Sequence, residues 1–352
     1  MISQPIHLQF ESHKFFIFLF SFSHLKKAFL LVSYGSPEYR GDVAPFLKNL
    51  FQGRNVSPAV LEKVTTQYEE VALHTREFSP LSRECRLLIE KLQQRNVLQA
   101  PLFWGNLFWH PLLTDTLAEM SRQGVQKATV FITSPFDSEI SRKRYVDAIG
   151  GYEFHLLPAF GNHPLYYRAV ADQIITAGSV SDRFGGDLNR SLTLPAAIFQ
   201  DIAGTRILFT AHSLPLSDRG AGRYVSQLSE AASEVVRLLP NPIPWDLVFQ
   251  SRSGQPSDPW LEPDILVRIR QLAEERNRTG RPLSLLIVPV GFLLENKETV
   301  YDLDLQAVPL CEKFRIPAVR VATAGSSLPV LEMIEQLANH DHVGYRLKGQ
   351  KL

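Results

Sequence analysis

Polar side chains that could bind a metal ion or carry a proton follow three apolar segments of the chain. They are Tyr34, His212 and an acidic run over residues 295–304. Within that run Glu298 and Asp302 are four residues apart, so a helix places both carboxylates on one face. One imidazole with one or two carboxylates suits a borderline-to-hard divalent metal ion. These are too few ligands for a closed structural zinc site, so the sequence indicates a metal that is bound only transiently.

Each of these residues also has a purely structural interpretation. A tyrosine that ends a buried strand can belong to the core, and for Tyr34 alone the sequence favours that interpretation. His212 could equally be a hydrogen-bonded structural histidine, although ligands of α/β proteins bind at strand ends. Glu295, and with it Glu298, could cap the start of a helix, where negative charge is favourable. Capping accounts less naturally for Asp302, which lies one turn further in.

Apolar strands that alternate with amphipathic helices must position these residues. Short apolar runs predict strands, and apolar residues at helical spacing predict helices. The predicted strands are residues 29–35, 100–106, 127–136, 207–215, 246–254, 283–292 and 316–322, and the predicted helices are residues 60–68, 82–94, 112–123, 224–239, 263–275, 298–314 and 329–337. Such alternation favours parallel sheets, whose functional loops lie at the carboxyl ends of the strands.

The repeated pattern predicts an α/β fold with two similar Rossmann-like halves, each a parallel sheet flanked by helices, and a cleft between them. We expect residues 1–27 to be a disordered extension, residues 28–172 to form the first half and residues 173–325 the second. A helix over residues 326–340 is expected to pack back on the first half. A polar, Gly-rich stretch near residues 178–189 separates the two repeats.

The composition excludes several classes of protein. The chain has 352 residues, and its 37 Lys and Arg against 36 Asp and Glu leave a net charge of +1, without the basic excess of a nucleic-acid-binding protein. Two cysteines exclude a disulfide scaffold and any cluster that needs four thiolates. Neither a dinucleotide-binding Gly motif nor a phosphate-binding loop motif occurs, so no nucleotide cofactor is expected.

The first residues contain an apolar run from Phe15 to Phe22. This run is far shorter than the ~20 residues that a membrane-spanning helix needs. Glu11 precedes it and two lysines follow it, unlike the basic start and small-residue end of a signal peptide. We therefore expect a cytoplasmic protein without stable membrane insertion.

Five segments of the sequence resemble the ferrochelatases, most closely the coproporphyrin-type enzymes of bacterial haem synthesis. They are LLVSYGSP, WHPLLTDTLAEM, ILFTAHSLP, FQSRSGQPSDPWLEPDI and VPVGFLLENKETVYDLD, in this order between about Phe29 and Leu337. The resemblance implies a lyase that inserts Fe²⁺ into a porphyrin and releases two protons. It also implies two Rossmann-like halves with the macrocycle between them.

By position, the resemblance implies metal binding and catalysis at His212 and Glu298, with Asp302 as a further metal ligand. Tyr34 takes the place of a tyrosine that can ligate iron in the product. The other porphyrin contacts that it implies are Gln67, Tyr68, Ser79 and Tyr145. The expected substrates are ferrous iron and coproporphyrin III, with protoporphyrin IX as the alternative porphyrin, and no iron–sulfur cluster is expected.

Some positions depart from the family pattern. Asn296 and Lys297 replace the usual histidine and hydrophobic residue, Gln306 replaces a third helix carboxylate, and Phe51 replaces an arginine that often meets a propionate. A cation such as Lys297 beside an iron site would oppose metal arrival unless its side chain points away. These departures keep open a diverged porphyrin- or haem-binding paralogue without metallation activity, and a chelatase for another metal or tetrapyrrole.

Overall fold

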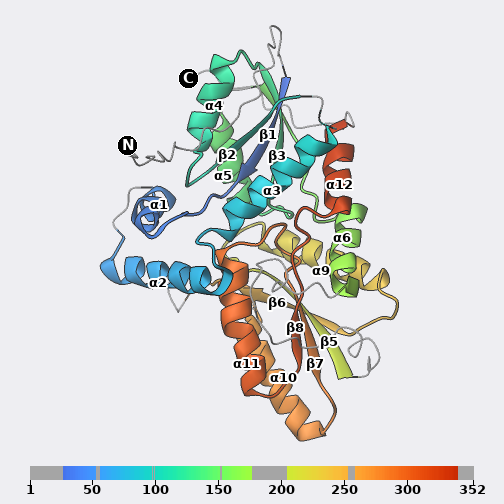
Figure 1. The fold of residues 1–352 in the computed structure, drawn as a ribbon. Helices are drawn as coiled ribbons and strands as arrows, with labels where there is room; N and C mark the ends of the chain where they lie inside the picture. Colours follow the sequence, from blue (N-terminus) through green and yellow to red (C-terminus); the bar gives the residue numbers. More distant parts are fainter. Residues whose placement is uncertain are drawn as a thin grey trace, which may run out of the picture.

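The computed structural model describes residues 27–52, 56–96, 98, 100–150, 153–176, 204–252 and 258–339 of the chain. The first 26 residues and the Gly-rich stretch lie outside the described residues. Figure 1 shows the described elements as two α/β units, one above the other in that view.

The first sheet has four parallel strands in the order β2-β1-β3-β4. They are β1 (Lys27–Ser33), β2 (Leu102–Asn106), β3 (Lys127–Ile132) and β4 (Glu153–Leu156). After its exposed first residue, all of β1 is buried. A central strand with helices on both faces is expected to be apolar throughout rather than alternating.

The second sheet repeats this topology, in the order β6-β5-β7-β8. Its parallel strands are β5 (Thr205–His212), β6 (Trp245–Gln250), β7 (Ser284–Val288) and β8 (Ala318–Arg320). In each half the first strand is central, the second lies on one side and the next two on the other. The predicted α/β fold with two similar parallel sheets is therefore confirmed.

Helices connect the strands of both halves (Figure 1). They are η1 (Arg40–Asp42), α1 (Val43–Leu50), α2 (Pro58–Thr75), α3 (Pro80–Arg95), α4 (Leu113–Arg122), α5 (Glu139–Ile149), α6 (Pro164–Thr176), α9 (Ala221–Arg237), α10 (Ile265–Thr279), η3 (Thr299–Ala307), α11 (Val308–Lys313) and α12 (Leu328–Asn339). The segment η3 is a π-helix that continues into α11. None of the described helices combines the length and apolar character needed to cross a membrane.

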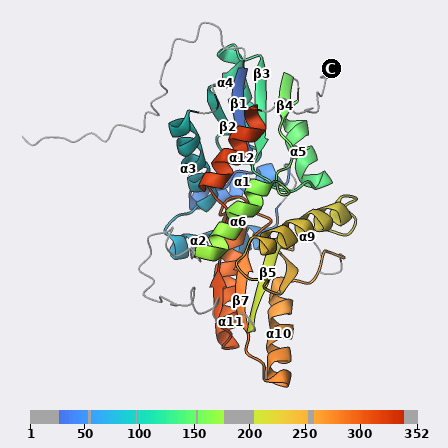
Figure 2. The same cartoon turned by 90° about the vertical axis from the view of Figure 1, so that its right-hand side faces the viewer.

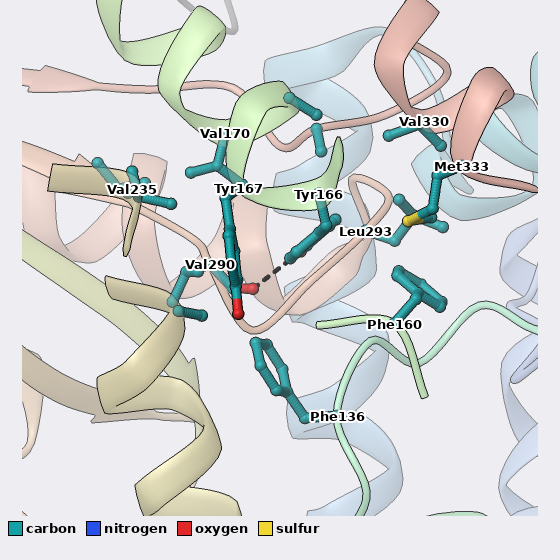
Figure 3. Close-up of a cluster of buried hydrophobic side chains, with 14 of the residues drawn as sticks. Phe136, Phe160, Tyr166, Tyr167, Val170, Val235, Val290, Leu293, Val330 and Met333 are labelled. Atoms are coloured by element: carbon teal, nitrogen blue, oxygen red, sulfur yellow. Dashed lines mark hydrogen bonds between the residues drawn. The ribbon is translucent and has the colours of Figure 1, made fainter. Parts of the chain in front are cut away.

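One hydrophobic cluster extends through both halves. It includes Phe29 of β1 and Phe209 of β5, and Figure 3 shows the part of it around Tyr166 of α6. The fully buried Tyr166 hydroxyl donates hydrogen bonds to the carbonyl oxygens of Val290 at 2.9 Å and Phe292 at 3.3 Å. This contact fixes the loop that leads from β7 toward the acidic run.

The last described helix, α12, lies beside α3 and α6 (Figure 2). Arg95 of α3 pairs with Glu335 of α12 at 3.2 Å, and Lys91 donates to the Ser326 carbonyl at 3.0 Å. The predicted boundary between residues 172 and 173 lies inside α6. The division of the chain into separate domains stays a prediction.

Candidate active site

His212 is the last residue of β5, the central strand of the second sheet. Its Nδ1 contacts the carbonyl oxygen of Ser213, and since a carbonyl only accepts, Nδ1 carries the proton in this contact. The other ring nitrogen, Nε2, lies 3.7 Å from Oε1 of Glu298. About a third of each side chain is exposed, 34% for His212 and 36% for Glu298. A neutral His212 therefore presents the Nε2 lone pair to a ligand beside a carboxylate.

Glu298 directly precedes the π-helix η3, and Asn296 caps the turn that positions it. The Asn296 Oδ1 atom accepts hydrogen bonds from the backbone N–H of Glu298 at 2.8 Å and of Thr299 at 3.1 Å. Asn296 replaces the usual histidine of the family and here has a role in local backbone structure.

The prediction that Glu295 caps the helix is wrong. Its side chain is fully buried and accepts hydrogen bonds from Arg320, from the Thr323 backbone N–H and from the Thr299 hydroxyl. Burial opposes ionisation, but Arg320 and these hydrogen bonds hold the pKa of Glu295 at about 2. Glu295 is thus an ionised carboxylate inside the protein, and its hydrogen-bond donors are not residues of the predicted metal site.

Asp302 lies within η3 and is held from the end of β6. The Ser251 hydroxyl donates to its Oδ2, and Gln250 Nε2 lies 3.5 Å from the same atom. Burial raises the pKa of Asp302 to about 6, the Ser251 hydrogen bond opposes that rise, and the negative charge of Glu298 adds to it. A carboxyl with this pKa exchanges protons close to neutral pH.

Within the described part of the chain, no group of three or more His, Cys, Asp and Glu side chains could hold a metal ion. The structure brings His212 and Glu298 together, whereas Asp302 is bound to Ser251 and Gln250. The three predicted metal ligands therefore lie in two groups, the His212–Glu298 pair and Asp302 with its own partners, and metal binding by them stays a prediction. Gln250 and Ser251 were not predicted as site residues, although their place at a strand end is a signal for ligand binding.

Lys297, which the sequence placed beside the metal site, lies against an aromatic ring. Its Nζ atom is 5.3 Å from the centroid of the Tyr301 ring, one helical turn away. This contact stabilises the ammonium group by a cation–π interaction. The lysine charge also acts on Asp302, whose pKa it lowers.

Tyr34 directly follows β1. Its side chain is 37% exposed, and its ring lies 4.6 Å from that of Phe108. Removal from water and then the charge of Glu298 raise the pKa of the phenol. Because Glu298 also raises the pKa of Tyr68, its carboxylate acts on two tyrosines of the first half.

Gly35 permits the close packing behind Tyr34. Its φ is +84°, which L side chains rarely adopt, and a Cβ there would lie 2.9 Å from the Trp109 backbone nitrogen. The loop with Phe108 and Trp109 can approach Tyr34 only because this position is glycine.

The remaining predicted porphyrin contacts have other neighbours in the structure. Tyr68 is buried, accepts a 3.4 Å hydrogen bond from Ser36 and stacks on Phe78. Ser79 caps α3 by accepting a hydrogen bond from the Ser82 backbone at 3.2 Å. Tyr145 is buried in the core of the first half, and Gln67 lies half-buried on α2. Their contacts with a porphyrin stay predictions.

The sequence profile of the family described as Ferrochelatase matches residues 26–342. The chain belongs to the ferrochelatase family. Its members are lyases that insert a metal ion into a porphyrin. The resemblance inferred from the motifs is thereby confirmed.

Relatives of this ferrochelatase cover most of its length. The coproporphyrin III ferrochelatase of Nocardia farcinica is 36% identical over 321 residues, which are 85% of this chain and 84% of that protein. The coproporphyrin III ferrochelatase of Frankia alni is 34% identical over 340 residues, 89% of this chain and 80% of that one. The Rhodopirellula baltica protein named Ferrochelatase is 34% identical over 319 residues, 87% and 84% of the two chains.

In a ferrochelatase, the metal ion and the porphyrin must meet at a base. By their chemistry, His212 Nε2 can accept a proton, the Glu298 carboxylate can stabilise the resulting imidazolium or ligate a cation, and the Asp302 carboxyl can exchange protons. These side chains are therefore candidates for the metal-insertion site, and their roles stay predictions.

Proposed function

We propose that this ferrochelatase inserts Fe²⁺ into coproporphyrin III, which binds between Tyr34 of the first half and His212 of the second. The observation that carries the proposal is the pair of His212 Nε2 and Glu298 Oε1, 3.7 Å apart at the end of β5. The influence of Glu298 on the pKa of Tyr34 supports a shared site. A base, a carboxylate and a phenol then face a single ligand.

In this proposal the porphyrin N–H protons leave through His212 and Glu298. His212 Nε2 accepts the first proton, because Nδ1 already carries one toward the Ser213 carbonyl. Glu298 stabilises the imidazolium that results. As iron enters the ring, Glu298 accepts the second proton and passes it to Asp302, whose pKa of about 6 allows release near neutral pH. His212, whose side chain is 34% exposed, returns the first proton to solvent and becomes neutral again. Two N–H bonds break, two protons reach solvent, and iron stays ferrous.

The iron is proposed to arrive by the reverse route. Carboxylates are suitable ligands for a partly hydrated divalent cation. Asp302 meets the ion first and Glu298 delivers it to the ring, where the pyrrole nitrogens replace the remaining ligands. The Lys297 ammonium group lies over the Tyr301 ring, and its charge lowers the pKa of Asp302, which favours the ionised carboxylate that a metal ion needs.

The choice of coproporphyrin III is supported by the names of the Nocardia and Frankia relatives. Comparing kcat/KM for coproporphyrin III and protoporphyrin IX, at fixed anaerobic Fe²⁺, tests it. The proposal expects the higher value for coproporphyrin III. Equal values, or a preference for protoporphyrin IX, would contradict the substrate assignment without affecting the metal site.

We also propose that the protein acts in the cytoplasm, with neither an iron–sulfur cluster nor a nucleotide. Burial raises the pKa of both Cys85 and Cys311 to about 12, which disfavours the thiolate that a cluster needs. Iron and acid-labile sulfide in the purified full chain, and its fraction in cell extracts with and without residues 1–26, test these points. A stoichiometric cluster, or a membrane fraction that depends on residues 1–26, would contradict them.

A further inference from the structure

A buried ion cluster lies behind the two carboxylates of the metal route. Arg320 at the end of β8 makes a two-pronged contact with Glu295, with Nη1 to Oε1 at 3.0 Å and Nη2 to Oε2 at 2.5 Å. Its Nε lies 3.3 Å from Oδ1 of Asp304 in the π-helix. The side chains of Arg320, Glu295 and Asp304 are 5%, 0% and 8% exposed. One guanidinium therefore holds two carboxylates in the interior.

The two carboxylates of this cluster lie in the sequence just before and just after the segment that carries the proposed site. In sequence, Glu295 precedes Glu298 and Asp304 follows Asp302. Arg320 is hydrogen-bonded to Glu295, and its Nε makes an ionic contact with Asp304 at 3.3 Å that lacks hydrogen-bond geometry. Glu295 is also fixed by the Thr323 backbone N–H at 2.8 Å and by the Thr299 hydroxyl at 2.8 Å. Contacts on the buried side of η3 thus fix how the helix is rotated about its axis. In this orientation Glu298 lies beside His212, and Asp302 lies beside Ser251.

Stability alone does not explain such a cluster. Removing an ion pair from water costs free energy that its Coulombic attraction often fails to recover. Asp304 Oδ2 and the Thr323 hydroxyl, moreover, are buried without a hydrogen-bond partner among the described residues. A bidentate arginine–carboxylate contact does, however, fix direction as well as distance. A π-helix is an uncommon backbone, found mostly at functional sites, and needs surrounding contacts to persist.

We propose that Arg320 is a positioning residue for metal delivery, which holds the π-helix through Glu295 and Asp304 so that Glu298 and Asp302 face His212. The inference rests on the proposed metal route through those two carboxylates. Arg320 itself touches neither metal nor porphyrin. Small displacements of a positioned group can cost as much as about 100-fold in rate.

The test compares Arg320→Lys with the wild-type full chain. Lysine keeps the positive charge but loses the planar fork that binds both Glu295 oxygens. Three quantities are measured: Co²⁺ affinity of the porphyrin-free protein from its visible absorption, coproporphyrin III affinity from fluorescence quenching, and KM and kcat for Zn²⁺ insertion. We expect Co²⁺ affinity to fall and the metal KM to rise, each about tenfold, with porphyrin affinity changed less than about twofold.

A matched control is Arg268→Met in the same half. Arg268 pairs with Asp246 of β6 at 2.9 Å, and β6 and β8, which carries Arg320, are opposite edge strands of the second sheet. Its loss should leave Co²⁺ affinity and metal KM unchanged. If Arg320→Lys shows a lower melting temperature but wild-type Co²⁺ affinity and metal KM, its role is structural only and the proposal is overturned.

Two further variants test the proposal if Arg320→Lys does not fold, and test the metal site independently of Arg320. If Arg320→Lys does not fold, Asp304→Asn, which leaves the Glu295 contact intact, takes its place. A higher metal KM in that variant supports the proposal, and an unchanged one overturns it. His212→Ala separates this inference from the proposed function: wild-type Co²⁺ affinity in that variant would show that the proposed metal site itself is wrong, whatever Arg320 does.

Discussion

At the scale of single residues, the two nitrogens of His212 have different surroundings. Nδ1 faces the Ser213 carbonyl and Nε2 faces the Glu298 carboxylate. This fixes the ring and leaves one lone pair available for a proton or a metal ion. An imidazole held in this way can accept a proton at one nitrogen while the other keeps its hydrogen bond.

His212→Ala should therefore remove metallation while the porphyrin still binds. We expect kcat to fall about 10²- to 10⁴-fold, the usual contribution of a general base. Coproporphyrin III affinity, from fluorescence quenching, should stay within about threefold, because the other proposed porphyrin contacts belong to the first half. His155→Ala, at the edge strand β4, is the matched control and should retain full activity. Full turnover by the His212 variant would refute its assigned role.

Asp302 makes stability depend on pH. Its folded pKa of about 6 is above the ordinary value of 3.8, so between these values the folded state holds a proton that the unfolded state has lost. Ionising the buried Asp302 lowers the free energy of unfolding. This loss of stability is absent at low pH and grows as pH rises from about 4 to 6. Asp302→Asn removes it and should stabilise the protein by about 1–2 kcal/mol at pH 7.

Thermal unfolding at pH 4 and pH 7 checks this expectation. The melting temperature of the Asp302→Asn variant should exceed that of wild type at pH 7 and approach it at pH 4. The same variant should raise the metal KM. A melting difference that is equal at both pH values would show that Asp302 does not titrate in this range.

At the scale of elements, the carboxyl ends of the strands bring the site together. β1 ends before Tyr34, β5 ends at His212, and β6 ends before Ser251. Ser251 adopts a left-handed backbone with φ of 62°, uncommon for a residue other than glycine, and this turn places its hydroxyl on Asp302. The loop after β7 is held in turn by Tyr166 of α6.

Tyr166→Phe tests that support. The substitution removes the hydroxyl and leaves the buried carbonyls of Val290 and Phe292 without this donor. Loss of a buried hydrogen bond should lower the free energy of unfolding by about 1–3 kcal/mol, measured by urea denaturation. Tyr167→Phe, a neighbouring tyrosine outside this contact, serves as the control. Equal stability of the Tyr166 variant and wild type would contradict the role of the hydroxyl.

Much of this architecture was predictable from apolar runs and helical spacing. Every strand except β4, and the helices α2, α3, α4, α9, α10 and α12, lie where the sequence predicts them. α6 was missed because residues on most of its sides are buried, so no polar face marks the helix. The predicted helix over 298–314 is one continuous element, but its first part is a π-helix, which residue spacing did not reveal.

The site was predictable where chemistry-bearing residues end a strand. His212 and Tyr34 could be singled out on that ground, and Glu298 by its four-residue spacing from Asp302. The structure places Glu298 beside His212, and its charge raises the pKa of Tyr34. Arg320 could not, since an arginine at the end of a short apolar segment is normally expected at the surface. Its role depends on Glu295 and Asp304, which only the folded chain brings to it.

At the scale of the whole molecule, a shared core joins the two sheets that carry the site. Met333 of α12 is fully buried in the cluster that also contains residues of β1 and β5. Figure 3 places its side chain near Phe160 and Leu293, which come from different halves. The relative position of Tyr34 and His212 therefore depends on packing as well as on each sheet.

Met333→Ala should lower the stability of both halves against unfolding, because both pack on the same cluster. A buried Met→Ala change typically costs about 2–5 kcal/mol of unfolding free energy. Because the cluster is continuous, urea denaturation should show one transition, displaced to lower concentration, by both tryptophan fluorescence and circular dichroism. Two separate transitions would show that the halves unfold independently.

We propose that His212 and Glu298 form a working metal-insertion site despite Asn296 and Lys297. The most direct measurement is the absorption spectrum of coproporphyrin III with anaerobic Fe²⁺ and a catalytic amount of the full-length protein. We expect the free-base Q bands to collapse into those of the iron porphyrin over many turnovers, and Glu298→Gln to slow this strongly. Tight porphyrin binding with no metallation by any divalent ion would contradict the claim and indicate a porphyrin-binding paralogue.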